Sequence, residues 1–166
     1  YRGYLLNQKR SPMMPMSSSR GCPYQCVFCE TPSGKNFRAN SAEFITDMME
    51  VYVQKFGIKE TPFLDDTFTV SEKRVFEICE LKNKKNIDLT WFANAHANVR
   101  NMDIFKAMKS AGAWLVSLGI ESGSPKIIEL LKKGTTKEQM RATGQGILDA
   151  KLKFKPLFIV CARSVS

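Results

Sequence analysis

The sequence contains a single histidine, and no apolar run reaches the roughly 18 residues that a membrane-spanning helix needs. The first residues, Tyr1 to Tyr4, do not follow the charged-then-apolar order of a secretory signal peptide. Only five of the 166 residues are cysteines, which is too few, and an odd number, for a secreted disulfide scaffold. These absences argue against a membrane span and predict a reducing compartment, which we take to be the cytoplasm.

The composition is that of an ordinary folded protein, with 43% hydrophobic and 25% charged residues. The net charge of +9 favours an acidic partner or a polyanion. However, the basic residues are scattered, and we expect most of them on solvated helix surfaces and helix ends. Examples on predicted helix ends are Lys82, Lys84, Lys85, Lys132 and Lys133. No basic stripe is interleaved with aromatic residues, so nucleic acid is not expected as a partner.

Short apolar runs alternate with amphipathic segments along the whole chain. The runs predict strands within residues 11–19, 61–64, 89–93, 114–118 and 154–160. Such alternation produces parallel strands joined by helical crossovers. We therefore predict an α/β fold, a partial (β/α) barrel with parallel strands and about five βα units. A small doubly wound sheet is the alternative architecture.

Capping residues and helical spacing predict helices that start near positions 41, 71, 101, 125 and 136. In the first of these helices, Asn40 or Ser41 is the expected cap and Gly57 the expected stop. Its apolar residues are expected to share one buried face. They are Phe44, Ile45, Met48, Met49, Tyr52 and Phe56.

Residues 1–166 are predicted to be a single domain. The chain lacks an initiator methionine and a sixth strand, so we expect truncation at the C-terminus and consider it at the N-terminus. In either architecture, functional groups should gather at the carboxyl ends of the strands. The Cys22–Cys29 loop, Asp65 to Thr67, residues 94–98 and Glu121 all follow predicted strands.

Three cysteines, Cys22, Cys26 and Cys29, follow one another in the spacing C-x3-C-x2-C. Three thiolates so close in sequence can surround one metal centre, and thiolates favour zinc or an iron–sulfur cluster. A cubane cluster held by three cysteines leaves one iron open for chemistry. A zinc site would need His96 as its fourth ligand, and buried free thiols are a third reading. Spacing and flanking residues favour the iron–sulfur cluster, whereas Cys79 is expected in the core.

This motif, with Phe28 just before the third cysteine, resembles the signature of the radical S-adenosylmethionine superfamily. The resemblance extends over about residues 10–160. Within the superfamily, the sequence resembles the branch that often carries a cobalamin-binding domain upstream. The later motifs are Phe63-Leu64-Asp65-Asp66-Thr67-Phe68-Thr69, Trp91, Lys109-Ser110-Ala111-Gly112-Ala113, Gly119-Ile120-Glu121-Ser122-Gly123 and Lys133-Gly134-Thr135-Thr136.

The resemblance implies that Cys22, Cys26 and Cys29 hold a [4Fe–4S] cluster and that S-adenosylmethionine is the second cofactor. Reductive cleavage of S-adenosylmethionine would yield a 5′-deoxyadenosyl radical, which abstracts hydrogen from an unidentified small-molecule or macromolecular substrate. It also implies an acidic electron donor such as a flavodoxin or ferredoxin. Cobalamin would be bound by a domain outside this chain.

The resemblance also implies cofactor-binding roles for individual residues. Phe28 would pack beside the adenine, and Asp65, Asp66 and Thr67 would face the amino group of the methionine part. Glu121 would bind the ribose or the amino-acid part, since a carboxylate suits a diol as well as an ammonium.

The sequence departs from the pattern of this branch in two places. His96 and Asn98 occupy positions where an arginine and an aspartate are often found. The chain ends at Cys161–Ser166, where the family usually has a Gly-Pro-Gly-Glu-like turn and a sixth strand. A structural zinc domain and an inactive cluster-binding remnant are therefore alternative functions. Within the enzyme reading, methylation, methylthiolation of RNA and ring chemistry all stay open.

Overall fold

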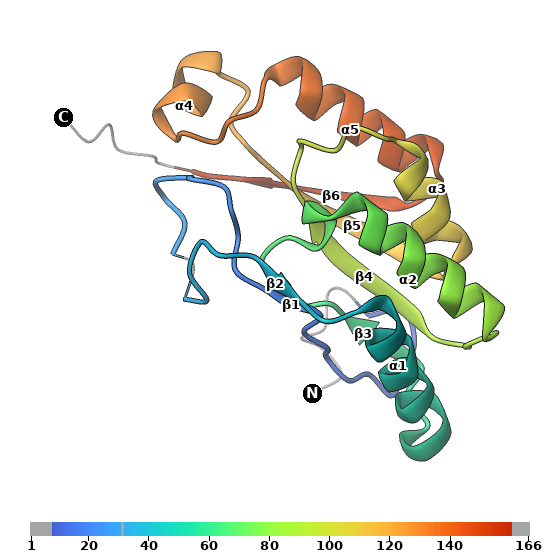
Figure 1. The fold of residues 1–166 in the computed structure, drawn as a ribbon. Coiled ribbons are helices and arrows are strands. Elements are labelled where there is room, and N and C mark those ends of the chain that lie inside the picture. Colours follow the sequence, from blue (N-terminus) through green and yellow to red (C-terminus); the bar gives the residue numbers. More distant parts are fainter. Residues whose placement is uncertain (1–7, 31, 161–166) are drawn as a thin grey trace.

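A computed structural model of the chain describes residues 8–30 and 32–160, so Cys161 lies outside the described residues. Four parallel strands form one sheet in the order β3-β4-β5-β6 (Figure 1). They are β3 (Glu60–Pro62), β4 (Thr90–Ala95), β5 (Ala113–Glu121) and β6 (Lys153–Phe158). The predicted parallel α/β architecture is confirmed, and the sheet is an open part of a barrel.

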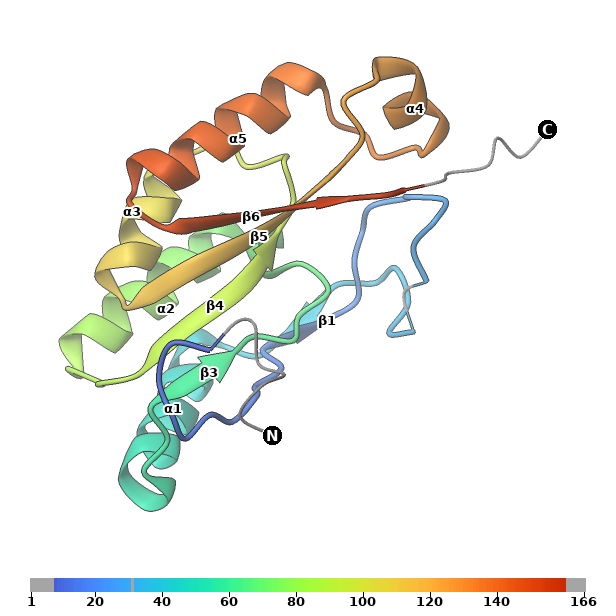
Figure 2. The same ribbon diagram turned by 180° about the vertical axis from the view of Figure 1, so that it is seen from behind.

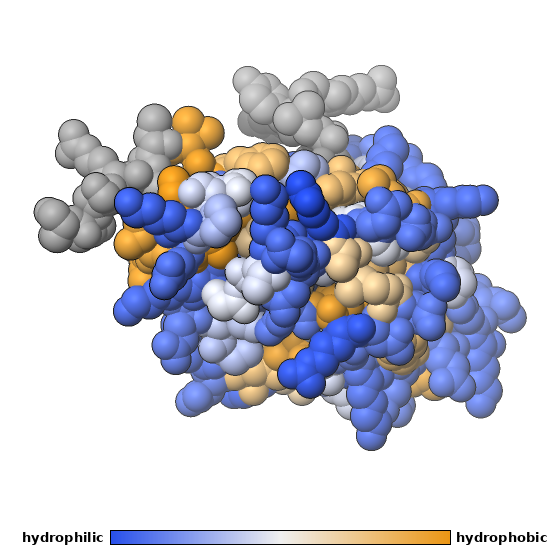
Figure 3. All heavy atoms as spheres, turned by 90° about the horizontal axis from the view of Figure 1, so that it is seen from above, coloured by the Kyte–Doolittle hydropathy of each residue, from blue (hydrophilic) through white to orange (hydrophobic). Residues whose placement is uncertain are grey.

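The helices connect these strands and cover one face of the sheet (Figures 1 and 2). They are α1 (Ala42–Phe56), the short 3-10 helix η1 (Phe68–Val70), α2 (Glu72–Lys84), α3 (Asp103–Ser110), α4 (Pro125–Leu130) and α5 (Lys137–Asp149). Seen from above, the surface is mostly hydrophilic, with hydrophobic side chains in small groups (Figure 3). Within the described residues, no helix combines the length and hydropathy that crossing a membrane requires.

The first predicted strand is only partly formed. Met13 and Met16 make isolated parallel bridges to Glu60 and Phe63, so this segment runs beside β3 without becoming a continuous strand. Pro12 precedes the first bridge and Pro15 lies between the two bridges, and proline has no N–H to donate to a ladder. The chain then forms β1 (Ser19–Arg20), which pairs antiparallel with β2 (Arg38–Ala39).

Helix α1 begins as predicted, because the side chain of Ser41 accepts a hydrogen bond from the N–H of Phe44. The predicted apolar face is wrong in two places. Ile45 and Met49 are buried, but the exposed fractions of Phe44 and Phe56 are 52% and 57%. Phe44 lies about 100° around the helix from Ile45, and Phe56 is the last residue of the helix.

Three aromatic side chains fill the core between β3, β4 and η1. The ring centroid of Phe63 lies 4.6 Å from that of Phe68 and 5.4 Å from that of Trp91. The indole N–H of Trp91 donates a hydrogen bond to the carbonyl of Ala111 at 2.7 Å. This packing fixes the carboxyl end of β3, from which Asp65 to Thr67 emerge, against β4 and η1.

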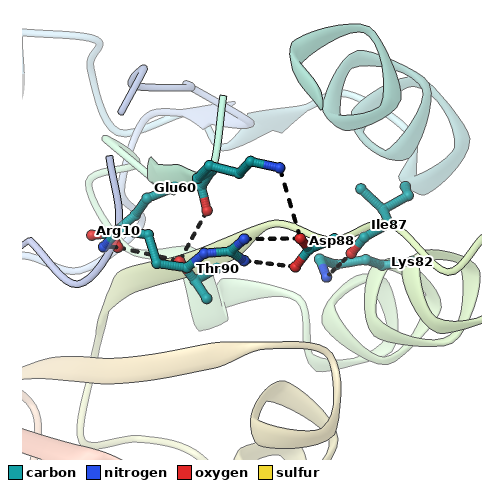
Figure 4. Close-up of polar contacts among 7 residues, drawn as sticks. Arg10, Glu60, Lys82, Ile87, Asp88 and Thr90 are labelled. Carbon is teal, nitrogen blue, oxygen red and sulfur yellow. Dashed lines mark hydrogen bonds and ion pairs between the residues drawn. The ribbon is translucent and has the colours of Figure 1, made fainter. Parts of the chain in front are cut away.

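A polar cluster lies at the amino-terminal ends of β3 and β4 (Figure 4). Arg10 donates two hydrogen bonds to the carboxylate of Asp88, at 2.6 and 2.8 Å. Glu60 accepts hydrogen bonds from the backbone N–H groups of Lys9 and Arg10 and from the hydroxyl of Thr90. These bonds tie the segment before Met13 to the sheet.

Two lysines that we expected on solvated helix ends, Lys82 and Lys133, are in fact buried, each with an exposed fraction of 4%. Lys82 extends from α2 and donates a hydrogen bond to the carbonyl of Ile87 at 2.7 Å (Figure 4). Burial lowers the pKa of Lys82 to about 8, although the nearby charge of Asp88 opposes this shift.

The buried Lys82 makes stability depend on pH. Its pKa falls from 10.5 to about 8 on folding, so the folded protein binds fewer protons than the unfolded protein between these values. The free energy of unfolding should therefore rise by up to about 1 kcal/mol as pH increases from about 7.5 to about 9. At higher pH, Cys79 opposes this rise because burial raises its pKa to about 12.

Urea unfolding at several pH values, on the wild type and Lys82→Met, measures this contribution. The variant should lack the rise. Parallel pH profiles for the two proteins would contradict the prediction.

Candidate functional site

A cavity of about 250 Å³ opens at the carboxyl ends of β4 and β5. Six separate stretches of the chain contribute to its wall: the cysteine loop, the turn after β3, the ends of β4, β5 and β6, and the residues after α4. The lining residues that carry polar or reactive side chains are Cys22, Tyr24, Cys26, Cys29, Asp66, Thr67, Asn94, His96, Ser117, Glu121 and Lys133. The predicted gathering of functional groups at this edge of the sheet is thus present.

All three motif cysteines line this cavity, and they are buried to different extents. Cys22 is buried, Cys26 is half-buried and Cys29 is exposed. Burial raises the pKa of Cys26, and the nearby Cys22 and Cys29 thiolate charges raise it further, whereas the charge of Lys133 lowers it. Within the described residues, no three His, Cys, Asp or Glu side chains are placed to hold a single metal ion. The thiols therefore surround a space and do not converge on one point.

The start of the cysteine loop depends on Gly21. Its φ of +84° is unfavourable for residues with a side chain, and a Cβ here would lie 2.2 Å from the carbonyl oxygen of Asn36. Beside it, the N–H of Cys22 donates to the carbonyl of Gly34 at 3.2 Å, which closes the loop. The N–H of Val27 donates to the carbonyl of Leu131, which ties the loop to the end of α4.

Asp65 does not line the cavity, although we predicted it as a cofactor-binding residue. Its carboxylate, with an exposed fraction of 1%, accepts hydrogen bonds from the N–H and hydroxyl of Ser18 and from the hydroxyl of Ser19, at 2.5 to 2.6 Å. Arg74 donates to the carbonyls of Ser18 and Asn40 from the same side. Asp65 thus anchors the segment that leads into the cysteine loop.

The next two residues do reach the cavity. The carboxylate of Asp66 accepts a hydrogen bond from the N–H of Gly21 at 3.1 Å. The hydroxyl of Thr67 donates to the carbonyl of Asp66 and lies 3.7 Å from the sulfur of Cys22. Asp66 and Thr67 therefore lie beside the first cysteine, at the edge of the sheet where we expected functional groups to gather.

Glu121 ends β5 and forms a buried ion pair with Lys133 across the cavity wall. The ammonium nitrogen of Lys133 lies 3.0 Å from the carboxylate oxygen. Glu121 adopts a φ of +60°, a strained conformation for a residue with a side chain. The sequence identified Glu121 as a site residue, but nothing in the Lys132-Lys133 doublet indicated that its second lysine is buried.

His96, the one histidine, lies in the cavity wall and stacks on Tyr24 of the cysteine loop. The ring centroids are 3.6 Å apart and the planes differ by 8°. The exposed fraction of His96 is 6%, and neither ring nitrogen has a hydrogen-bond partner. Burial, and to a lesser extent the charge of Lys133, lowers the pKa of His96 to about 4, against an opposing contact with the Lys133 backbone. The ring is therefore neutral near pH 7.

Phe28 and Asn98 both lie near the cysteine loop. Phe28 lines the outer part of the cavity and is partly exposed. Asn98 accepts a hydrogen bond from Gln139 and also interacts with Tyr24, where its hydrogen bond lowers the pKa of the phenol against the larger, raising effect of burial. The departures at His96 and Asn98 thus both contact Tyr24, between the first two cysteines.

These residues fit a thiolate-held cluster together with a polar ligand. The donor set is three thiols around a common space, and thiolates are the usual ligands of iron–sulfur clusters. Beside the thiols, the cavity wall carries the carboxylates of Asp66 and Glu121 and the hydroxyl of Thr67, which can bind a ligand with hydrogen-bonding groups.

Comparison with known proteins agrees with this geometry. The sequence profile of the Radical SAM superfamily matches residues 16–150. An uncharacterized methyltransferase of Pyrococcus horikoshii is 40% identical to this chain over 130 residues, which are 77% of this chain and 28% of that protein. The chain thus spans less than a third of the length of this relative.

Two solved structures share the fold. OxsB, a cobalamin-dependent S-adenosylmethionine radical enzyme with aqua-cobalamin and S-adenosylmethionine bound, superposes with a TM-score of 0.79 at 23% identity, over 87% of this chain and 23% of OxsB. TsrM, a radical S-adenosylmethionine methyltransferase from Kitasatospora setae with cobalamin and a [4Fe–4S] cluster bound, gives 0.76 at 17% identity, over 88% of this chain and 30% of TsrM. Because the superfamily profile covers most of its length, the chain belongs to the radical S-adenosylmethionine superfamily of enzymes.

Proposed function

We propose that this chain is the S-adenosylmethionine-cleaving core of a radical methyltransferase, with Cys22, Cys26 and Cys29 as ligands of a [4Fe–4S] cluster. The observation that carries the proposal is that all three thiols line one cavity with the unpartnered His96 and with Glu121. When bound, the cluster supplies the electron that breaks the sulfonium C–S bond of S-adenosylmethionine. The side chains of the cavity bind and orient that cofactor.

The roles of the polar residues follow from their positions. Asp66 and Thr67 lie beside Cys22 and offer oxygen acceptors to the ammonium of the methionine part. Phe28, on the outer wall, offers an apolar face to the adenine. Asp65 is a positioning residue, because its carboxylate oxygens are already used by the segment before the cysteines.

Glu121 would hold the ribose or the amino-acid part, and its orientation is tightly set. Lys133 holds one carboxylate oxygen at 3.0 Å. The pair also needs the absence of a side chain at Gly119, where a Cβ would lie 2.3 Å from the Glu121 oxygen and 2.8 Å from the Lys133 nitrogen. The ion pair thereby leaves the second oxygen of Glu121 available to a ligand.

Methyl transfer is the reaction class that the relatives favour. The Pyrococcus relative is named a methyltransferase, and so is TsrM, which binds cobalamin. Since the chain spans less than a third of either protein, we propose that substrate binding and a cobalamin-binding domain belong to a longer protein that includes this core.

Anaerobic reconstitution with iron and sulfide tests the proposal. After addition of S-adenosylmethionine and dithionite, chromatography should detect 5′-deoxyadenosine. Cys26→Ala should abolish the product, whereas Cys79→Ala, which removes a buried thiol outside the cavity, should retain it. Retention of zinc without cluster assembly would support a structural zinc domain. A cluster without cleavage would identify an inactive remnant.

The Gly119 contact predicts the effect of one added methyl group. Gly119→Ala should force Glu121 and Lys133 apart and lower the free energy of unfolding by roughly 1–3 kcal/mol. Gly123→Ala is the matched control, since a Cβ there meets no atom within 4 Å. Urea denaturation measures both variants. Equal stability of the two would mean that the ion pair tolerates displacement.

A further prediction concerns the effect of His96 on binding of S-adenosylmethionine. His96→Phe retains an aromatic ring that can stack on Tyr24 but removes both ring nitrogens. We expect the dissociation constant of S-adenosylmethionine for the reconstituted protein to rise about tenfold, the loss of one typical hydrogen bond. Equilibrium dialysis measures this constant, and iron content checks that the cluster is retained. An unchanged constant would show that His96 does not contact the cofactor.

A further inference from the structure

The two-stranded ribbon formed by β1 and β2 carries two arginines on directly opposed positions. Arg20 pairs with Arg38 in the antiparallel register, and both side chains are exposed. Like charges directly opposite each other on neighbouring strands destabilise the pairing. A short ribbon that keeps this arrangement therefore gains if a negatively charged group binds across it.

Neither arginine is neutralised by the described parts of the chain. Across residues 8–30 and 32–160, no ion pair involves Arg20 or Arg38. The guanidinium of Arg38 donates only to the carbonyl of Ser33, at the long distance of 3.4 Å. By contrast, Arg10 and Lys85 each pair with a carboxylate. The charge of the ribbon is thus available to a partner.

The surface around these arginines is concave and polar. A hollow of about 320 Å³ is lined by Ser17, Ser18, Ser19, Arg20, Arg38, Ala39 and Asn40. Arg74 lies beneath it, because its guanidinium donates to the carbonyls of Ser18 and Asn40. Its third nitrogen, Nη1, is buried without a partner. The charge of Arg74 is opposed by the nearby Asp65, so the positive potential of the hollow comes mainly from the exposed Arg20 and Arg38.

Two carboxylates lie near the hollow, but neither forms an ion pair with Arg20 or Arg38: the buried Asp65 offsets the charge of Arg74, and Asp66 accepts a hydrogen bond from the N–H of Gly21. Asp65 accepts its hydrogen bonds from Ser18 and Ser19 and forms no ion pair with either exposed arginine. Lys35 adds another exposed positive charge on the same loop, where it donates to the carbonyl of Tyr24. The ribbon is thus a positive surface that adjoins the cysteine loop.

The position of the ribbon suggests what binds to it. Arg20 precedes Cys22 by two residues, so their Cα atoms are at most about 7 Å apart. The proposed cleavage of S-adenosylmethionine consumes one electron, which has to come from another molecule. A protein that docks on the ribbon is brought within a short distance of the first cysteine.

We propose that the β1–β2 ribbon, through Arg20 and Arg38, is the docking surface for an acidic one-electron carrier protein. This rests on the proposed function, and it names the partner's chemistry and its contact residues. The net charge of +9 favours such a partner over the whole surface, and the ribbon directs it to the cysteine loop. Charge-steered docking of this kind weakens as salt screens the charges.

Binding of a flavodoxin, an acidic carrier used as the probe, tests the surface directly. Calorimetry on the reconstituted protein compares Arg20→Glu/Arg38→Glu with Lys84→Glu/Lys109→Glu. The control pair is exposed on the last turns of α2 and α3 and changes the net charge equally. We expect the arginine pair to raise the dissociation constant at least tenfold more than the lysine pair. Equal losses would mean that only net charge matters and would overturn the proposal.

A second experiment separates docking of the carrier from the cleavage of S-adenosylmethionine. Methyl viologen radical, a small cationic reductant, needs no docking surface, so it should support 5′-deoxyadenosine formation equally in Arg38→Glu and in the wild type. With reduced flavodoxin, the same variant should be slower and its Michaelis constant for flavodoxin higher. Arg38 is used alone here because it lies outside the cysteine loop, and circular dichroism checks its folding.

The two experiments distinguish failure of the proposed function from failure of the docking proposal. If methyl viologen yields no 5′-deoxyadenosine in the wild type, the proposed function fails, while calorimetry still decides whether the ribbon binds flavodoxin. If inorganic phosphate or a short oligonucleotide binds with the same dependence on the arginines and flavodoxin does not, the hollow is a site for phosphate groups and the docking proposal is wrong.

Discussion

The buried carboxylate of Asp65 joins the two parts of the molecule that the site requires. It emerges from β3, whose position is fixed by the packing of Phe63 against Trp91, and it holds Ser18 and Ser19 by three hydrogen bonds. Because hydrogen bonds to a buried charge are stronger than neutral ones, this contact is expensive to break. Without it, the cysteine loop would have no fixed relation to the ends of β4 and β5, and the cavity would lose one wall.

Much of the fold follows from local patterns in the sequence. The apolar runs that became β4, β5 and β6 and the caps at Ser41, Ser71 and Thr136 are short-range signals, and each is found as predicted. The first strand was harder to predict, because two prolines leave it with only isolated bridges. The exposure of Phe44 and Phe56 was not predictable either, since it depends on where the helix ends against the sheet.

Most residues of the candidate site were predicted from the sequence, but the contacts between them were not. The three cysteines, Phe28, Asp66, Thr67 and Glu121 do share one cavity. That Asp65 turns away from the cavity was not predictable, because successive side chains of an extended segment point in opposite directions and a shift of one residue reverses which of them faces the cavity. The Tyr24–His96 stack and the burial of Lys133 also depend on tertiary contacts between distant segments, which spacing along the chain does not encode.

The graded depth of the three thiols gives the cavity an inside and an outside. Cys22 is buried, Cys26 half-buried and Cys29 exposed, so a reagent that arrives from solvent meets Cys29 first. Iron supplied during maturation would follow the same order and be captured at the rim before it reaches the innermost sulfur. Oxidants would also reach the thiols in this order, so oxidation of an empty site should begin at Cys29. The sulfur of Cys22, beside Thr67, should be protected longest.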